Sequence, residues 1–442
     1  MDKLLEVREF DKISCNPDFK TEYAYLPEPV FKELEKFIHA YIGNEDHADA
    51  LEFLSIGYRR NVGNIISVSN YVGLIQMKGG YQVQVLPKID FGDGVDKTKE
   101  VFLRMLRSMK DFPCKVFNDA SLKMDRMPLY EIFINMYLQE ARMLVKHGLK
   151  SAYIDRKDNL NFYKGKLVVG EHIKRNLAHG ERFFVCYDEY RLDRAENRLI
   201  KVTLLKLQKL SGSSENQKAI RQLLPAFETV TASVNYRKDF SKISIDRNTK
   251  DYEILMRWSK VFLLNKSFTT FSGSTDARAL LFPMEKVYES YVVTQMKASF
   301  ADLNWEISAQ DKGYYLFDAP RQFALRPDIV VTRDDGSRII LDTKWKSLTD
   351  NSKKNYGISQ ADMYQMYAYS KKYGTSEIWL LYPLNQEMRD HEDISFKTYD
   401  GVDVRVFFID VAHIEDSLSE LRKQLIPLPE TEKILKTMGG TD

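Results

Sequence analysis

Two apolar runs decide the fold of this chain: Leu325-Arg326-Pro327-Asp328-Ile329-Val330-Val331 and Ile339-Ile340-Leu341-Asp342-Thr343-Lys344. Both are typical of β-strands because β-branched and aliphatic residues dominate them. Between them lies Arg333-Asp334-Asp335-Gly336-Ser337, whose Asp-Gly pair supplies the positive φ angles that a tight turn needs. The sequence therefore predicts a β-hairpin.

Three charged side chains are expected at one end of this hairpin. Side chains alternate along a strand, so Asp342 and Lys344 share a face, and Asp328 enters from the neighbouring strand. Unpaired charges are costly to bury in such an apolar hairpin, and a divalent cation held by the carboxylates relieves that cost. The lysine is then left to activate or orient a water molecule. The other interpretation is a surface Asp-Lys pair without a function.

An acidic helix is predicted upstream of the hairpin. Pro283 suits its first turn, and apolar residues then recur at helical spacing at Met284, Val287, Tyr288, Tyr291, Val292 and Met296. Glu285 and Glu289 lie four residues apart at one margin of this stripe. Helical geometry alone leaves open which of the two reaches the metal.

A second helix and a buried strand are predicted downstream. The helix runs from Gln360 to Lys372, with Asp362, Gln365 and Tyr369 on one side. An amide and a phenol one turn apart can bind phosphate oxygens or support the catalytic strand. Tyr364 and Tyr367 are expected in the core. The run 376–383 predicts a strand, and the resulting order of helix, strand, strand, helix, strand indicates a mixed sheet flanked by helices.

Length and composition limit the class of protein. The chain has 442 residues, enough for two or three domains, and 44% of them are hydrophobic, enough for a sizeable core. A net charge of +2 means that any nucleic-acid site must be a local patch. Cys15, Cys114 and Cys186 are scattered, which argues against a zinc ribbon or a cysteine-ligated cluster and fits a reducing cytoplasm. No apolar leader, membrane span or Gly-rich phosphate loop is expected.

We predict three regions. Residues 1–95 are expected to be an α+β module that binds a partner, with a helix over 28–42 and a hairpin formed by 72–77 and 81–86. Residues 96–270 are expected to be mainly helical, and residues 271–442 to form the domain that carries the hairpin site. The segment 91–94 is the nearest approach to a linker.

Two basic segments lie in the middle region. Lys174 and Arg175 belong to the first, and Arg237 and Lys238 to the second, where aromatic residues are interleaved. Such clusters suit contacts to DNA phosphates, although each also fits a solvated surface.

The Pro-Asp…Asp-x-Lys arrangement resembles the PD-(D/E)xK nuclease superfamily. That resemblance implies a restriction-endonuclease-like mixed sheet and Mg²⁺ held by Asp328, Asp342, Glu289 and the Thr343 carbonyl. It favours Glu289 over Glu285, because related nucleases carry a hydrophobic-aromatic-Glu step matched here by 287–289. It also implies that Lys344 orients or deprotonates the attacking water. Its other implications are a place for Gln365 beside the catalytic site, within a Gln-x-x-x-Tyr element, and DNA contacts by Lys346 and Tyr369.

Over most of the chain, the order of motifs resembles McrC, the nuclease subunit of McrBC-type restriction systems. The landmarks are Val62-Gly63-Asn64-Ile65, Val85-Leu86-Pro87-Lys88-Ile89, Pro128-Leu129-Tyr130-Glu131-Ile132-Phe133, Lys164-Gly165-Lys166-Leu167, Glu196-Asn197-Arg198-Leu199-Ile200-Lys201 and Leu341-Asp342-Thr343-Lys344-Trp345-Lys346. The resemblance implies an endonuclease that cuts double-stranded, modified DNA in the cytoplasm with an McrB-like AAA+ GTPase hexamer. The amino-terminal portion is expected to dock to that ring through Arg59, Arg60 and Asn61.

Two other functions stay open at this point. One is a stand-alone nuclease of repair or mobile-element origin, without an AAA+ partner. The other is a non-catalytic adaptor that clamps DNA and activates a motor. Three costly charged groups kept together argue against the adaptor, because a retired site has no need of them.

Overall fold

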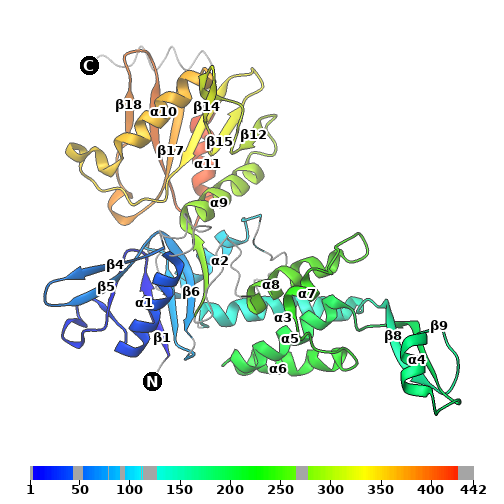
Figure 1. Cartoon of the computed structure of the whole chain (residues 1–442). Helices are drawn as coiled ribbons and strands as arrows, with labels where there is room; N and C mark the ends of the chain where they lie inside the picture. Colours follow the sequence, from blue (N-terminus) through cyan, green and yellow to red (C-terminus); the bar gives the residue numbers. More distant parts are fainter. Residues whose placement is uncertain are drawn as a thin grey trace, which may run out of the picture.

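The computed structural model describes residues 3–42, 53–77, 79–89, 95–110, 112, 127–264 and 277–426. They form an amino-terminal β-rich part, a helical part that extends into a long arm, and a carboxy-terminal sheet covered by helices (Figure 1). The expected linker at 91–94 lies outside the described residues. Among the described residues, no helix combines the length and apolar character needed to cross a membrane.

The amino-terminal part contains two four-stranded sheets and one long helix. One sheet has the order β3-β2-β5-β4 and the other β1-β7-β6-β11. The helix α1 spans Glu28–Ile42 and packs its apolar face on this part, as its pattern predicts. The hairpin predicted around Gly79-Gly80 is confirmed as β6 and β7. The strands are β1 (Leu4–Arg8), β2 (Lys12–Ser14), β3 (Ala24–Tyr25), β4 (Leu54–Arg59), β5 (Gly63–Val68), β6 (Tyr71–Met77), β7 (Gln82–Leu86) and β11 (Ala277–Pro283).

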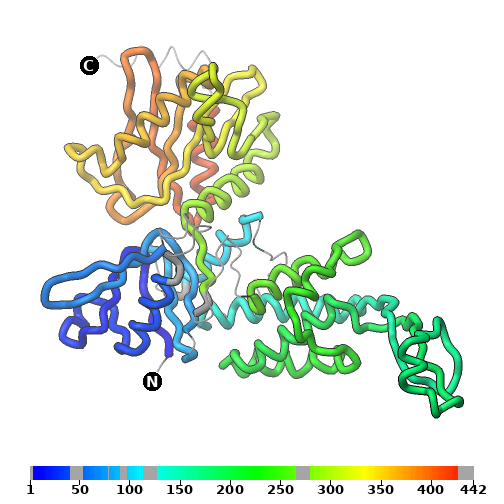
Figure 2. Tube along the Cα trace, in the orientation of Figure 1, coloured from blue at the N-terminus to red at the C-terminus, as the bar shows by residue number. Residues whose placement is uncertain are grey.

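Strand β11 links the amino-terminal sheet to the carboxy-terminal part of the molecule. It pairs antiparallel with β6 over its whole length, from Ala277 opposite Met77 to Pro283 opposite Tyr71. The predicted carboxy-terminal domain, residues 271–442, included β11. In the structure, β11 instead completes the amino-terminal sheet. The tube in Figure 2 shows the chain leaving this sheet and entering the upper part of the molecule.

The middle region is helical, as expected, and its helices share one hydrophobic core with β6. The helices are α2 (Val95–Leu106), α3 (Leu129–His147), α5 (Ala195–Leu210), α6 (Ser214–Leu223), α7 (Tyr236–Phe240) and α8 (Glu253–Leu264). Unexpected from the sequence is an arm formed by β8 (Ala152–Leu160), β9 (Lys166–Leu167), α4 (Val169–Asn176) and β10 (Phe183–Arg191). It projects away from the rest of the molecule (Figure 1).

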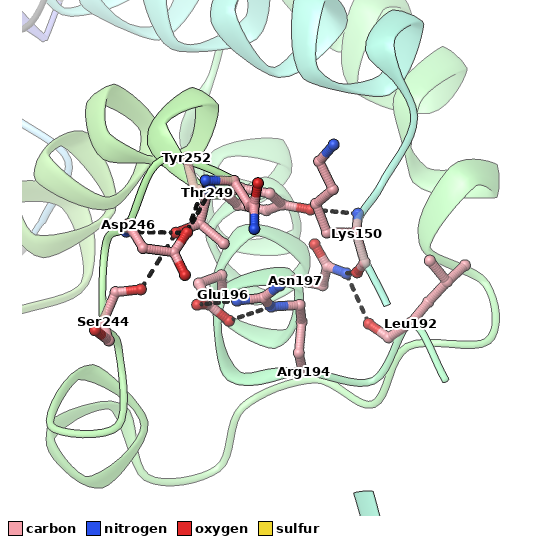
Figure 3. Close-up of polar contacts among 10 residues, drawn as sticks. Lys150, Leu192, Arg194, Glu196, Asn197, Ser244, Asp246, Thr249 and Tyr252 are labelled. Carbon is pink, nitrogen blue, oxygen red and sulfur yellow. Dashed lines mark hydrogen bonds and ion pairs between the residues drawn. The ribbon is translucent and has the colours of Figure 1, made fainter. Parts of the chain in front are cut away.

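A buried polar cluster fixes the base of this arm (Figure 3). The Asn197 amide donates to the carbonyls of Lys150 and Leu192, at 3.0 and 2.7 Å, and these residues flank the two long arm strands. Tyr252 accepts from the Lys150 amide at 2.8 Å, and the Arg194 guanidinium lies over its ring. Arg194 also forms two 2.7 Å hydrogen bonds to Glu196. One side chain therefore holds both strands of the arm.

An Asn197→Ala substitution is expected to lower the free energy of unfolding by about 1–3 kcal/mol, because it removes the two hydrogen bonds that the Asn197 amide donates to the Lys150 and Leu192 carbonyls. Asn197 is fully buried. Denaturant unfolding measures the effect. Asn248→Ala, at an exposed loop position nearby, is the matched control and is expected to change stability by less than about 0.5 kcal/mol. Equal stability of the two variants contradicts this role for Asn197.

The carboxy-terminal part is built on a six-stranded mixed sheet with the order β12-β15-β16-β17-β19-β18. β15 and β16 are the predicted hairpin, with Gly336 at φ +79° in its turn. β16, β17 and β19 run parallel to one another. The strands are β12 (Glu306–Ala309), β15 (Ile329–Thr332), β16 (Arg338–Thr343), β17 (Glu377–Pro383), β18 (Ser395–Lys397) and β19 (Asp403–Ile409); a separate hairpin pairs β13 (Tyr315–Asp318) with β14 (Arg321–Ala324).

Helices cover both faces of this sheet, which explains why β16 is apolar along most of its length. α9 (Met284–Ser299) and α11 (Ile414–Leu425) pack on the face that includes Leu341. α10 (Gln360–Tyr373) packs on the opposite face, which includes Ile340. The predicted helices over α9 and α10 are therefore confirmed. The expectation that Tyr364 and Tyr367 lie in the core is wrong: they are 66% and 41% exposed. The stripe that α10 buries is instead Met366, Tyr369 and Tyr373.

Candidate active site

The two aspartates of the hairpin lie opposite each other. Ile329 pairs with Leu341, so the next position along the ladder sets Asp328 beside Asp342. Asp328 accepts hydrogen bonds from the main-chain amide and the hydroxyl of Thr343, at 2.8 and 2.6 Å. Burial raises the pKa of Asp328 against these two bonds. Burial, together with the charge of Asp328, raises the pKa of Asp342 to about 7.

Lys344 completes this group. Its ammonium lies 2.6 Å from Asp342 Oδ2 and 3.7 Å from Asp362 Oδ1. Asp342 and Lys344 therefore share one side, as strand alternation predicts. Burial favours the neutral amine, but the nearby carboxylates outweigh it and raise the pKa of Lys344 above its ordinary value.

Glu289 lies close to this group, from α9. Burial and the charge of Asp328 raise the pKa of Glu289 to about 7, while a 2.9 Å hydrogen bond from Gln310 opposes the shift. Glu285, one turn earlier, accepts instead from Asn70 at 3.2 Å, at the junction with the amino-terminal part. Of the two glutamates, Glu289 is thus the one whose charge interacts with Asp328.

A cavity of about 360 Å³ opens at this place, lined among others by Glu285, Glu289, Asp328, Thr343, Lys344 and Asp362. Its walls carry both acidic and basic groups. Asp342 is 1% exposed and paired with Lys344. The site is therefore a polar pocket at the ends of β15 and β16, between α9 and the start of α10.

The donor set fits Mg²⁺, which is commonly held by one or two carboxylates together with water. Asp328 and Asp342 supply two hard oxygen donors whose mutual repulsion a cation relieves. Within the described residues, no three His, Cys, Asp or Glu side chains are grouped as a ready-made metal site. Glu289 accepts the hydrogen bond from Gln310 through one oxygen, Oε1, so its carboxylate can serve as a third ligand without breaking that bond.

Three further residues were predicted to belong to the site or to contact DNA: Gln365, Tyr369 and Lys346. Gln365 donates to the Tyr369 hydroxyl at 2.7 Å, as the expected pair on one side of α10. Tyr369 is only 1% exposed, which argues against the DNA contact expected for its hydroxyl. Lys346 is half-exposed and lies 3.5 Å from Asp362.

The remaining basic segments are not part of this pocket. Lys174 and Arg175 lie on α4 of the arm, both beside Glu171. Arg237 and Lys238 are exposed on α7. Both helices lie apart from the six-stranded sheet (Figure 1). Arg59, Arg60 and Asn61 form the exposed turn between β4 and β5 in the amino-terminal part.

Three neighbours of the site carried no assigned role in the sequence analysis. Asp362 stands in the first turn of α10, after the N-cap Ser359, and a hydrogen bond from the Ser359 side chain and the charges of Lys344 and Lys346 lower its pKa despite burial. The sequence pattern already places Asp362 on the same side of this helix as Gln365. Gln310 and Lys286 gave no comparable signal, because they come from a loop after β12 and from a helix with many charged residues.

Fold and site together define a mixed α/β protein with an acidic, lysine-containing pocket at a strand end. The chain belongs to the family described as McrBC 5-methylcytosine restriction system component, whose model matches residues 66–383, more than half of the chain. It is a McrC-like protein within that family. No curated protein matches the sequence.

The solved structures that are similar to this chain include two from Thermococcus gammatolerans. One is a refined half-complex from a tetradecameric assembly of Thermococcus gammatolerans McrB AAA+ hexamers with bound McrC, with a TM-score of 0.70 and 17% identity over 96% of this chain and 100% of that chain. The other is the cryo-EM structure of the Thermococcus gammatolerans McrBC complex, with a TM-score of 0.48 and 19% identity over 67% of this chain and 88% of that chain. The first match shows a shared fold over nearly the whole chain.

Proposed function

We propose that this chain is the Mg²⁺-dependent endodeoxyribonuclease subunit of an McrBC-like restriction complex, with a PD-(D/E)xK site in its carboxy-terminal domain. The observation that carries the proposal is the convergence of Asp328, Asp342 and Lys344 at the end of one hairpin. One buried and one half-buried carboxylate beside an amine are costly for stability, and phosphodiester hydrolysis explains why they stand together.

In the proposed mechanism, Asp328 and Asp342 hold Mg²⁺, with Glu289 and the Thr343 carbonyl as further ligands. The bound metal supplies Lewis-acid stabilisation of charge on the phosphate. Because the neighbouring carboxylates raise the pKa of Lys344, its amine is charged near neutral pH. We therefore assign Lys344 to orienting the attacking water and stabilising negative charge, rather than to removing a proton. Asp362 holds the Lys344 ammonium from the side of α10.

The proposed partners are double-stranded modified DNA and an McrB-like AAA+ GTPase hexamer that this chain stimulates. Membership of the family supports this assignment, as does the fold shared with a chain from an assembly of McrB AAA+ hexamers with bound McrC. We propose that residues 1–95 dock to the ring, with Arg59, Arg60 and Asn61 at the contact. We propose phosphate contacts for Lys174, Arg175, Arg237, Lys238 and Lys346.

Cleavage is expected only when the chain is combined with the partner, GTP and Mg²⁺, because the chain itself carries no phosphate-binding Gly-rich motif that could drive a motor. Gel analysis of methylated and unmethylated plasmid, with each component left out in turn, measures this dependence. Mg²⁺-dependent cutting by the chain alone favours a stand-alone nuclease. Stimulation of the partner's GTPase without any cutting favours the non-catalytic adaptor.

A further inference from the structure

Two polar side chains at the end of the amino-terminal sheet, those of Glu9 and Lys88, contact Trp345, the residue that follows the candidate catalytic Lys344. β1 pairs parallel with β7, with Arg8 opposite Leu86, so the residues after these strands emerge side by side. Glu9 follows β1 and Lys88 follows β7, and the Lys88 amide donates to Glu9 Oε2 at 3.0 Å. The sequence separates Lys88 from Trp345 by 257 positions, yet the fold brings them into contact.

Trp345 is held at both its side chain and its main chain. Its indole N–H lies 3.1 and 3.0 Å from the two oxygens of the Glu9 carboxylate. The Lys88 ammonium donates to the Trp345 carbonyl at 3.1 Å. The ring is 2% exposed and packs against Tyr288 of α9, with 5.3 Å between ring centroids.

Stability alone does not explain these polar groups. Glu9 is 3% exposed, and burial raises its pKa to about 7 although Lys88 and Trp345 both donate hydrogen bonds to it. A carboxylate taken out of water costs stability, and its hydrogen bonds repay that cost only when their geometry is excellent. The contact is therefore better explained by the geometry that it imposes on Trp345, which directly follows Lys344.

We propose that Glu9 and Lys88 are positioning residues for Lys344, because together they fix the residue that follows it. On the other side, the hydrogen bonds from Thr343 to Asp328 fix the residue that precedes it. Lys344 is thus held between two anchored neighbours, one anchored within the hairpin and one anchored by the amino-terminal module. The inference rests on the nuclease function proposed above, and it makes that site depend on a module whose described residues are not among those that line the cavity.

The test compares Lys88→Met, which keeps the side-chain stem but removes the donor, with Lys88→Arg, which keeps a donor. Lys12→Met, at an exposed position in the same module, is the matched control. In the complex with partner, GTP and Mg²⁺, Lys88→Met is expected to lower kcat for cleavage by about 10- to 100-fold, the size of effect that a displacement near 1 Å produces. KM for DNA, stimulation of the partner's GTPase and Tm are expected to stay near wild type. Lys88→Arg is expected to recover most of the rate.

Hydrogen exchange of the main-chain amides of Lys344 and Lys346 provides a readout that does not depend on cleavage. These amides are bonded to the carbonyls of Leu381 and Lys344, and we expect faster exchange in Lys88→Met than in Lys12→Met. Wild-type kcat together with wild-type exchange in Lys88→Met overturns the inference while the nuclease function stands. If the wild-type complex never cuts DNA, the proposed function fails, and the exchange of these two amides still decides whether Lys88 holds the segment.

Discussion

A Lys344→Ala variant is expected to lose DNA cleavage by about 100- to 1,000-fold, the range over which loss of one group that stabilises developing charge lowers kcat. The alanine removes the ammonium that lies 2.6 Å from Asp342, and with it the group assigned to the attacking water. Cleavage of methylated plasmid in the presence of partner, GTP and Mg²⁺ measures the loss. Partner binding and stimulation of its GTPase are expected to stay intact.

The matched control is Lys353→Ala, an exposed lysine in the segment between β16 and α10. It is expected to cut at the wild-type rate. Nicking by Lys344→Ala at the wild-type rate would falsify the assignment of this lysine. Loss of GTPase stimulation in the same variant indicates misfolding or failed assembly instead, which a melting curve of the variant distinguishes.

An Asp342→Asn variant is expected to abolish Mg²⁺-dependent cleavage and, without metal, to be more stable than wild type at pH 8. Burial raises the pKa of Asp342 to about 7 in the folded protein, against about 4 in an unfolded chain. The folded state therefore binds this proton more tightly. The stability that the carboxyl contributes is fully present below about pH 4 and is lost as the pH rises through 7.

Asparagine removes this titration, so the gain in stability is expected above pH 7, on the order of 4 kcal/mol for three pKa units, and to vanish towards pH 4. Unfolding in EDTA across this pH range measures the gain. Added Mg²⁺ is expected to raise Tm for wild type and not for Asp342→Asn, because only a folded state that binds the ion is stabilised by it. Asp335→Asn is the control, since Asp335 lies in the exposed hairpin turn with a lowered pKa. Equal Mg²⁺ shifts for wild type and Asp342→Asn contradict metal binding by Asp342.

The parts of the fold that local pattern specifies were predictable. The helix at 28–42 has the predicted bounds, and α9 buries the whole predicted stripe from Met284 to Met296. The grouping of Asp328, Asp342 and Lys344 also followed from local rules, because strand alternation and a short turn set the register of a hairpin.

The parts that depend on distant pairing were not predictable. β8 has the sequence AYIDRKDNL, which has no apolar alternation, and its partner β10 begins more than twenty residues later. β11 pairs with β6 across some two hundred residues. The prediction that Tyr364 and Tyr367 lie in the core was wrong. A helix rich in aromatic residues offers several candidate faces, and the face that packs against the sheet carries Met366, Tyr369 and Tyr373.

The pairing of β11 with β6 restricts where two homologues of this protein can be joined to make a chimaera. β6 is an inner strand only because Ala277–Pro283 lies against it, and β11 runs directly into α9, which carries Glu289. An exchange of carboxy-terminal halves between homologues preserves both parents' pairing only if the crossover falls after Pro283. A crossover near residue 271 places β6 of one parent against β11 of the other parent. The two strands must therefore come from the same parent.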